Sequence, residues 1–474
     1  MLVRLGVFAC LVSVLALAGC GGASEEGAAI GASADVVPAD VALYFSIGTD
    51  VDGEEWQKAE ALIDRFPDGE RANQFLELPG KEALGPETAV VMLDATSDDP
   101  PFLGLTQPSD RQKLEELLAR GDTPFVTDDV AGWTVFAEEQ ATIDRFEEAR
   151  GGGAGALADS KEYAAALDGL EEGLARVYVS NEALEEAAAR DRNEKTELFE
   201  ALLPEGEFPT VGLTIGAEDD GGRLDGKLVF EGDLEEAGVP VPYEAKLPAQ
   251  VPDGVLAYLS FNDFERGFSH VRDALGQIDP ALGRLSDDDL APLFAGEGAL
   301  YVRGGALIPE VTLVTQVDDE EGAVRTLDEV VEGFRRSEPT LSSPERTEIA
   351  GVEARRVAVE EPFSLYYAAF DGKLVVTTAR EGIADLREDG GRFADQESFA
   401  EAKEQAEMPG ETSGFAYVEL EEIVPLLLGY LGISGGEMPI PPEAAANLEP
   451  LQSLVAYATS EGETIRFSAF LAVK

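Results

Sequence analysis

The chain has 474 residues and a formal net charge of −59 at pH 7, from 94 acidic and 35 basic side chains. A field of this sign repels nucleic acid and anionic lipid headgroups, so nucleic-acid binding is excluded as a function. With 44% hydrophobic residues the chain can build sizeable cores, and its length is typical of roughly two to four domains.

The first predicted element is a secretory leader that ends at Cys20. Residues 2–16 are almost wholly apolar around Arg4, and this run is shorter than the roughly 20 residues of a membrane-spanning helix. Small residues precede the cysteine in Leu17-Ala18-Gly19-Cys20. This order resembles bacterial lipoprotein signal peptides, which implies a signal peptide at residues 1–19 and a diacylglyceryl group on the Cys20 thiol. Two acyl chains would anchor the protein stably at the extracytoplasmic face of the cell membrane.

A lipidated flexible tether is predicted over residues 20–35, which are rich in Gly, Ala and Ser. Cys10 lies in the leader, so Cys20 is the only cysteine of the mature chain. The mature protein therefore has no intramolecular disulfide, and thiolate zinc sites are excluded. Membrane lipid, held through the acylated Cys20, is the first partner that the sequence predicts.

An internal repeat organises the rest of the chain. Residues 37–46 (VPADVALYFS) match residues 251–260 (VPDGVLAYLS), with Val, Pro, Val, Tyr and Ser at identical spacing. Each copy predicts a turn, then a strand, then a helix; the two helices are expected at 56–66 and 264–278. In the second strand Ala257, Leu259 and Phe261 fall on one face, as Leu43, Phe45 and Ile47 do in the first.

We predict an α+β fold of two related copies, each an antiparallel or mixed sheet with packed helices, behind the lipoprotein signal peptide. The first copy spans residues 36–235 and the second spans residues 246–474. Prolines between residues 233 and 250 indicate a connecting segment. One continuous sheet formed by both copies stays open as an alternative.

The Val-Pro-x-x-Val-x-x-Tyr strand at residues 37–44, behind a lipoprotein leader, resembles the bacterial proteins grouped as domain of unknown function 3352. The resemblance covers most of the mature chain. It implies the location and the architecture only, because the family offers no established catalytic residues to carry over.

The second copy contains two segments that the first copy lacks or replaces. An extra hairpin is predicted at residues 363–376, and the apolar run IVPLLLGYLGI at 423–433 replaces a charged helix expected at 182–203. The apolar run is too short to span a membrane. It predicts either a buried helix under a loop or an exposed patch that contacts lipid or an envelope protein. The contact residues of such a patch would be Leu427, Leu428, Tyr430 and Leu431.

The sequence predicts no catalytic residues. His270, the only histidine, falls off the apolar stripe of its predicted helix and is expected to face water. The segment around Ser434 has the letters of a nucleophile elbow, but no histidine follows it and its context is wrong. The glycines of residues 151–156 follow a predicted helix instead of a strand, so they indicate a flexible connection and not a dinucleotide loop.

Acidic clusters are the remaining candidates for a site. They lie at residues 98–99, 219–220, 287–289 and 318–321, and none has the order of an EF-hand calcium loop. A solvated acidic surface explains them most simply, and calcium sites built from distant residues stay open.

Together these patterns predict a membrane-anchored lipoprotein with a binding or envelope-interaction role, without metal, cofactor or catalytic residues. Two alternatives stay open. One is an envelope hydrolase that uses carboxylates alone, and the other is a solute receptor with its ligand between the two copies.

Overall fold

The structure is a computed structural model that describes residues 30–50, 53–69, 81–97, 100–120, 123–153, 155–192, 196, 200, 203–263, 293–294, 296–305, 309–336, 340–360, 363–433 and 442–474. The leader, Cys20, His270 and Ser434 lie outside these residues, and so does the helix expected at 264–278. The predictions made for them therefore stay predictions.

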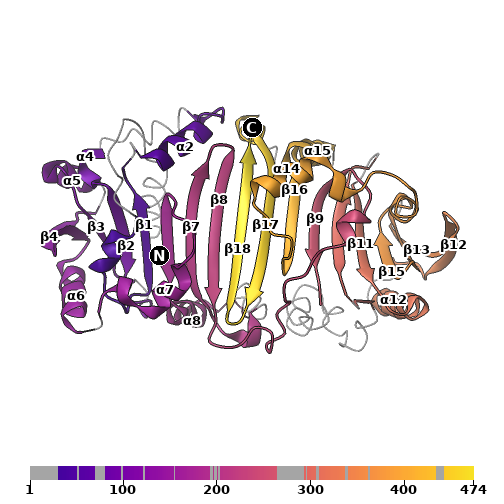
Figure 1. Ribbon diagram of the computed structural model, residues 1–474, viewed down its shortest axis with the longest axis horizontal. Coiled ribbons are helices and arrows are strands. Elements are labelled where there is room, and N and C mark those ends of the chain that lie inside the picture. The colour runs from indigo at the N-terminus through magenta and orange to yellow at the C-terminus, as the bar shows by residue number, and fades with distance from the viewer. Residues whose placement is uncertain are drawn as a thin grey trace.

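One continuous sheet of 18 antiparallel strands crosses the whole described molecule (Figure 1). The strands of the first half are β1 (Leu43–Gly48), β2 (Glu87–Met92), β3 (Phe102–Thr106), β4 (Val126–Val130), β5 (Trp133–Ala137), β6 (Ala175–Val179), β7 (Thr210–Glu218) and β8 (Gly221–Val229). Those of the second half are β9 (Val255–Phe261), β10 (Gly298–Arg303), β11 (Glu310–Gln316), β12 (Glu345–Ile349), β13 (Val352–Glu360), β14 (Phe363–Phe370), β15 (Lys373–Thr377), β16 (Gly414–Glu419), β17 (Leu451–Glu461) and β18 (Thr464–Val473).

Helices cover parts of both faces of this sheet, which confirms an α+β fold with a large antiparallel sheet. The α-helices are α2 (Glu54–Ile63), α4 (Lys81–Leu84), α5 (Arg111–Leu118), α6 (Gln140–Gly151), α7 (Lys161–Leu167), α8 (Asn181–Arg190), α12 (Glu320–Arg335), α13 (Glu381–Ala384), α14 (Glu397–Gln405), α15 (Leu420–Ile433) and α16 (Pro442–Ala446). Short 3-10 helices are η1 (Ala32–Asp35), η2 (Leu157–Asp159), η3 (Pro204–Gly206), η4 (Leu247–Ala249) and η7 (Phe393–Asp395).

Backbone pairing joins the two halves of the chain in a single sheet. The strand order is β4-β5-β3-β2-β1-β6-β7-β8-β18-β17-β16-β9-β10-β11-β15-β14-β13-β12. The halves meet where β8 pairs with β18, from Val229 opposite Thr464 to Gly221 opposite Ala472. Of the two arrangements that the sequence left open, the continuous sheet is the one observed.

The strand order on one side of this junction follows the same pattern as on the other. β1 lies between β2 and β6, and β9 lies between β10 and β16. β3 pairs with β2 on the side away from β1, and β11 pairs with β10 on the side away from β9. The hairpins β7–β8 and β17–β18 adjoin the junction from its two sides.

The extra hairpin of the second half is not the one that we predicted from the sequence. β15, and not β13, pairs with β11, as β5 pairs with β3. The predicted hairpin, β14–β15, therefore takes the place of β4–β5, and β12–β13 is the addition at the sheet edge. The sequence misled because all three hairpins turn on a pair of residues with positive φ: Ala131-Gly132, Ala350-Gly351 and Asp371-Gly372.

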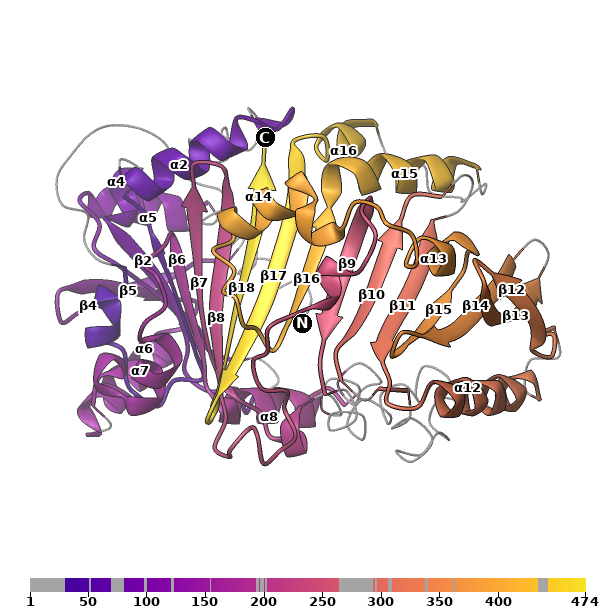
Figure 2. The same cartoon turned by 45° about the vertical axis from the view of Figure 1, so that its right-hand side comes forward.

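Successive side chains of each strand point to opposite faces of the sheet, and the two faces differ. One face, which we call the tyrosine face, carries the buried rings of Tyr44, Tyr178, Tyr258, Tyr301 and Tyr417. Helices α6 and α7 pack on it in the first half, and α13 and α14 in the second. Figure 2 shows α14 lying across β17 and β18.

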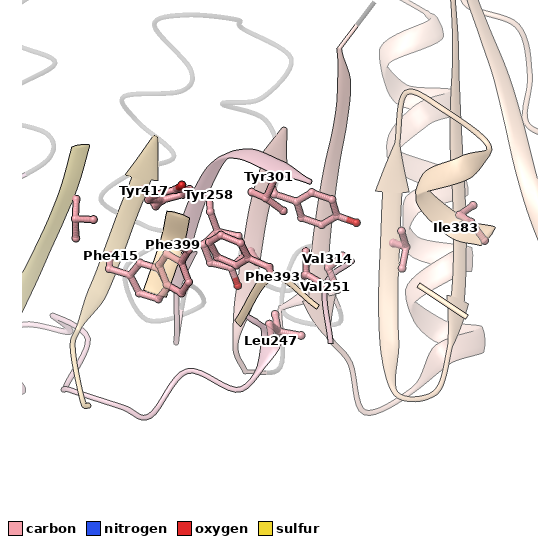
Figure 3. Close-up of a cluster of buried hydrophobic side chains, with 14 of the residues drawn as sticks. Leu247, Val251, Tyr258, Tyr301, Val314, Ile383, Phe393, Phe399, Phe415 and Tyr417 are labelled. Carbon is pink, nitrogen blue, oxygen red and sulfur yellow. The ribbon is translucent and has the colours of Figure 1, made fainter. Parts of the chain in front are cut away.

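Stacked aromatic rings fill the tyrosine face in the second half (Figure 3). The ring of Phe393 in η7 lies 4.6 Å from Tyr258 and 4.1 Å from Phe399 of α14, centroid to centroid. Phe415 and Tyr417 of β16 complete the cluster. Each such ring buries about 150–250 Å², so this cluster is a major source of packing energy.

Two buried carboxylates tie the segment before each half to the sheet. Glu87, at the start of β2, accepts hydrogen bonds from the Ser33 hydroxyl at 2.6 Å and the Ser33 amide at 3.3 Å. Ser33 is buried, so the prediction of a flexible tether over residues 20–35 is wrong for residues 32–35, which pack against the sheet. Glu297, directly before β10, accepts from the amides of Lys246 and Leu247 at 2.9 Å each. Both carboxylates thus meet the first turn of a 3-10 helix, where amides lack helical partners. Burial raises the pKa of both carboxyls, against the opposing effect of these hydrogen bonds.

A buried arginine links the two halves on the tyrosine face. Arg223 of β8 is 7% exposed and donates to the carbonyls of Gln405 at 2.9 Å and Ala406 at 3.1 Å, at the end of α14. Its guanidinium pairs with Glu218 and lies 5.1 Å from the ring centroid of Phe470. A cation at this position satisfies helix carbonyls and complements the helix dipole. The arginine therefore fastens a helix of the second half to a strand of the first.

Replacing either buried carboxyl with an amide should flatten the pH dependence of stability. A carboxyl whose pKa rises on folding stabilises the fold at low pH, and this contribution is lost as pH rises from about 4.5 through the folded pKa. In Glu87→Gln and in Glu297→Gln, the free energy of unfolding should therefore fall less steeply as pH rises, by up to about 1.4 kcal/mol per pH unit. Urea denaturation at several pH values above 4.5 measures the slope. Glu461→Gln, at an exposed carboxylate, is the control, and unchanged slopes in both buried variants would contradict the assignment.

Removing the Arg223 side chain should destabilise the whole sheet. Arg223→Ala should lower the free energy of unfolding by about 2–4 kcal/mol, because it leaves two helix carbonyls and a carboxylate without their donor. The matched control is Arg346→Ala on β12, whose side chain is 78% exposed in its pair with Glu353 and should contribute under about 1 kcal/mol. Equal losses in the two variants would show that Arg223 is not a link between the halves.

Candidate functional site

The face opposite the tyrosines is apolar and open at its centre. Leu259 of β9 and Leu300 of β10 are direct neighbours, and they are 46% and 38% exposed. Val311 of β11 is 38% exposed, and Ile215 of β7 is 41% exposed. Large apolar side chains therefore reach solvent on the same face of strands from both halves.

The strand register joins these side chains into one row. The direct neighbours across eight strands are, in order, Leu313, Leu300, Leu259, Ala416, Ala456, Ala469, Leu224 and Ile215. We call these eight residues the apolar row. A strand spacing of about 4.8 Å makes the row roughly 34 Å long. The row crosses the junction between the halves, where Ala469 of β18 faces Leu224 of β8.

The described helices on this face lie toward the strand ends. Trp56 and Leu62 of α2 form a core with Ile47, near one end of β1. In the second half α12 packs beside Leu374 of β15. Figures 1 and 2 show α2 and α15 along one end of the strands and α8 and α12 along the other. The apolar row is thus an open floor between helices at its two margins.

The predicted contact residues lie on α15, which directly follows β16 and contacts β9, β16 and β17. Leu427 is 49% exposed, its neighbour Leu426 is 45% exposed, and Leu428 is half-buried. The side chains of Tyr430 and Leu431 lie outside the described part of the structure. The interpretation of this run as a buried helix is therefore wrong at Leu426 and Leu427. The helix adds exposed apolar side chains beside the strand that carries Leu259.

Carboxyls with a raised pKa do not form a catalytic pair in the described structure. Glu87, Glu297 and Glu310 are each at most 5% exposed, and burial raises the pKa of each. Glu87 and Glu297 bind backbone amides in different halves, and Glu310 lies 3.8 Å from Arg303. Each carboxylate has its own structural partner, so these residues give no support to a carboxylate-only hydrolase.

The other sequence candidates have structural explanations where they are described. Asp319 caps α12 by accepting the Gly322 amide at 3.0 Å, which explains the acidic run at 318–321. Asp219 and Asp220 form the turn between β7 and β8. The acidic clusters at 98–99 and 287–289 lie outside the described residues.

The described residues contain no group of three histidine, cysteine or acidic side chains that could hold a metal ion. Among the helices that the structure describes, none has the length and hydropathy needed to cross a bilayer. The junction between the halves is filled by the pairing of β8 with β18, where a solute receptor of two lobes would need a cleft.

Sequence reasoning missed the apolar row. It placed Ala257, Leu259 and Phe261 on one face of a strand, and the structure does so. The covered face of β9, however, is the one with Tyr258 and Ser260, and Leu259 faces solvent. A signal was present in the sequence, since β9, β16 and β18 are apolar on both faces while few helices are available to cover them.

Comparison with known proteins does not assign a family. No family model matches the sequence, and no curated protein matches it. A solved structure described as crystal form IV of TP0453 aligns with 46% of this chain and 76% of that chain. The sequence identity is 14% and the TM-score is 0.25, values too low to support an argument about fold or function.

Proposed function

We propose that this protein is a non-catalytic binding protein, anchored by lipid at the extracytoplasmic face of the cell membrane, whose apolar row holds acyl chains. The observation that carries this proposal is the exposure of Leu259, Leu300 and Ile215 along one continuous row of the sheet. Soluble monomers rarely leave contiguous apolar patches larger than a few hundred Å² in water, and larger patches mark binding surfaces.

The shape of the row suits a thin apolar ligand. Its centre consists of Ala416, Ala456 and Ala469, and larger side chains, Leu259 and Leu224, stand on either side. Because alanine side chains project less from the sheet than leucine side chains, a methylene chain could lie over the alanines between the leucines. Each buried methylene contributes about 0.8 kcal/mol, so about ten of them suffice for micromolar affinity.

Charge defines the lipid class further. The net charge of −59 disfavours anionic headgroups, so the expected ligand is a neutral acyl lipid. The described side chains of the row are apolar throughout and carry no nucleophile or general base that would act on such a ligand. This supports a binding role in preference to the hydrolase.

The location and the repeat belong to the same proposal. The apolar leader, Cys20 and the tether support a lipoprotein at the membrane, as does the resemblance to the domain of unknown function 3352 family. We also propose that residues 36–235 and 246–474 are related copies. The common strand pattern of the two halves supports this, and so do the equivalent contacts of Glu87 and Glu297.

Polar substitutions in the apolar row should weaken lipid binding. Leu259→Gln combined with Leu300→Gln should raise the Kd for a fluorescently labelled monoacylglycerol at least about tenfold, because each leucine contributes roughly 1 kcal/mol of apolar contact. Both side chains are exposed, so the fold should tolerate the change. A fluorescence titration of the purified mature protein measures the affinity.

The matched control for this titration is Val241→Gln. Val241 is 38% exposed but lies in the segment that connects the halves, outside the apolar row. Its substitution should leave the Kd within about twofold of the unsubstituted protein. The proposal fails if the double variant binds the probe as well as the unsubstituted protein, or if Val241→Gln weakens binding equally.

Replacing the lipidated cysteine should abolish membrane attachment. Cys20→Ser removes the thiol that takes the lipid, so the protein should leave the membrane fraction or keep its leader. Cys10→Ser, within the leader, is the control and should leave attachment intact. Cell fractionation with mass spectrometry of the N-terminus gives the result. A Cys20→Ser protein that loses its leader yet stays at the membrane would show that another surface, such as α15, is the anchor.

A further inference from the structure

A pocket of about 690 Å³ lies in the first half, where α7 and α8 meet the ends of β6 and β8. Small-molecule sites in proteins usually have volumes of about 300–1,000 Å³. The apolar row contributes none of the residues that line this pocket. Any role of the pocket is therefore separate from the binding of acyl chains.

Acidic side chains dominate the pocket. Six of them take part in no ion pair among the described residues: Asp40, Glu162, Glu182, Glu186, Glu231 and Glu463. Lys161 is the one basic residue in the described lining. Carboxylates only accept hydrogen bonds when ionised, so the pocket offers acceptors and strong negative potential to whatever enters it.

Tyr178 provides an independent sign of a ligand. The residue is only 2% exposed, yet it lines the pocket, and its hydroxyl has no hydrogen-bond partner among the described residues. The tyrosine hydroxyl opens to the pocket, so a donor or acceptor that enters the pocket can become its hydrogen-bond partner. Burial raises the pKa of Tyr178 to about 12, and the charges of Glu162 and Glu182 act in the same direction. The hydroxyl therefore stays neutral and its oxygen can accept a hydrogen bond.

The second half contains a reference for this tyrosine. Tyr417 has the same position in β16, between β9 and β17, as Tyr178 has in β6, between β1 and β7. The Tyr417 hydroxyl donates to the Glu419 carboxylate and lies 2.9 Å from the Ser398 hydroxyl, from which it can accept. At the place of Glu419 the first half has Ser180, whose hydroxyl is used to cap α8. The tyrosine hydroxyl is thus satisfied internally in one half and left open toward the pocket in the other.

We propose that this pocket binds a linear organic polycation of the polyamine class, with one ammonium group hydrogen-bonded to the Tyr178 hydroxyl. An ammonium has three donors and no acceptor, which complements a tyrosine oxygen and surrounding carboxylates. The described carboxylates are spread along the pocket and are not grouped as ligands of a metal ion, so spaced ammonium groups fit them better than a single metal ion. Glu162 and Glu182, on α7 and α8, hold the ammonium groups on either side.

The test is isothermal titration of the purified mature protein with spermidine at about 0.15 M NaCl, where weak surface attraction is screened. We expect one saturable site in the unsubstituted protein. Tyr178→Phe removes only the hydroxyl and should raise the Kd about tenfold, the usual effect of losing a hydrogen bond to a charged group. The matched control is Tyr417→Phe, which removes the satisfied hydroxyl of the second half and should leave the Kd within about twofold.

A second variant covers the case in which Tyr178→Phe does not fold. Glu182→Gln lies on the exposed side of α8 and should raise the Kd severalfold, whereas Glu397→Gln, exposed on α14, should not. An adventitious attraction to the acidic surface would give no saturable site, equal effects in the paired variants, or displacement of spermidine by an equal charge of Mg²⁺. Any of these results would overturn the proposal, and none of them depends on whether the apolar row binds lipid.

Discussion

The pairing of β8 with β18 is the interaction on which the rest of the structure depends. These two strands lie at the boundary between the halves, and their hydrogen bonds join two groups of strands into one sheet. It also carries the apolar row across the junction and brings Arg223 to the end of α14. Without this ladder β8 and β18 would each be an unpaired edge strand, and exposed edge strands promote aggregation.

The two faces of the sheet contribute differently to the stability of the fold. The tyrosine face is closed by helices and stacked rings, and it contains the buried carboxylates and the buried arginine. Leu259, Leu300 and Ile215 on the other face remain in contact with water, so they contribute little of the hydrophobic free energy of folding. Because the same strands serve both faces, a ligand on the apolar row would rest on a floor already fixed by the packing behind it.

Local patterns predicted many of the strands and the turns between them, because side-chain alternation and turn residues act over a few positions, but they assigned the extra hairpin to the wrong pair of strands. They could not predict the pairing of β8 with β18, which depends on residues far apart in the chain. Alternation separated the faces of β9 correctly but could not say which one helices would cover, so the exposure of Leu259 was missed. Glu87 and Tyr178 were missed for a related reason. The sequence does not show which of 94 acidic residues is buried or which tyrosine lines a pocket, because both depend on neighbours in space.

The central position of β18 has a consequence for how the sheet is completed. β8 ends at Val229, and its partner β18 begins only at Thr464. More than two hundred further residues must therefore be synthesised before β8 can pair with its second neighbour. Contacts between such distant segments form slowly, since the intervening chain must first be ordered. During that interval the first half has an open hydrogen-bonding edge. The step that closes the sheet is therefore the arrival of β18, the strand that is synthesised last among the eighteen.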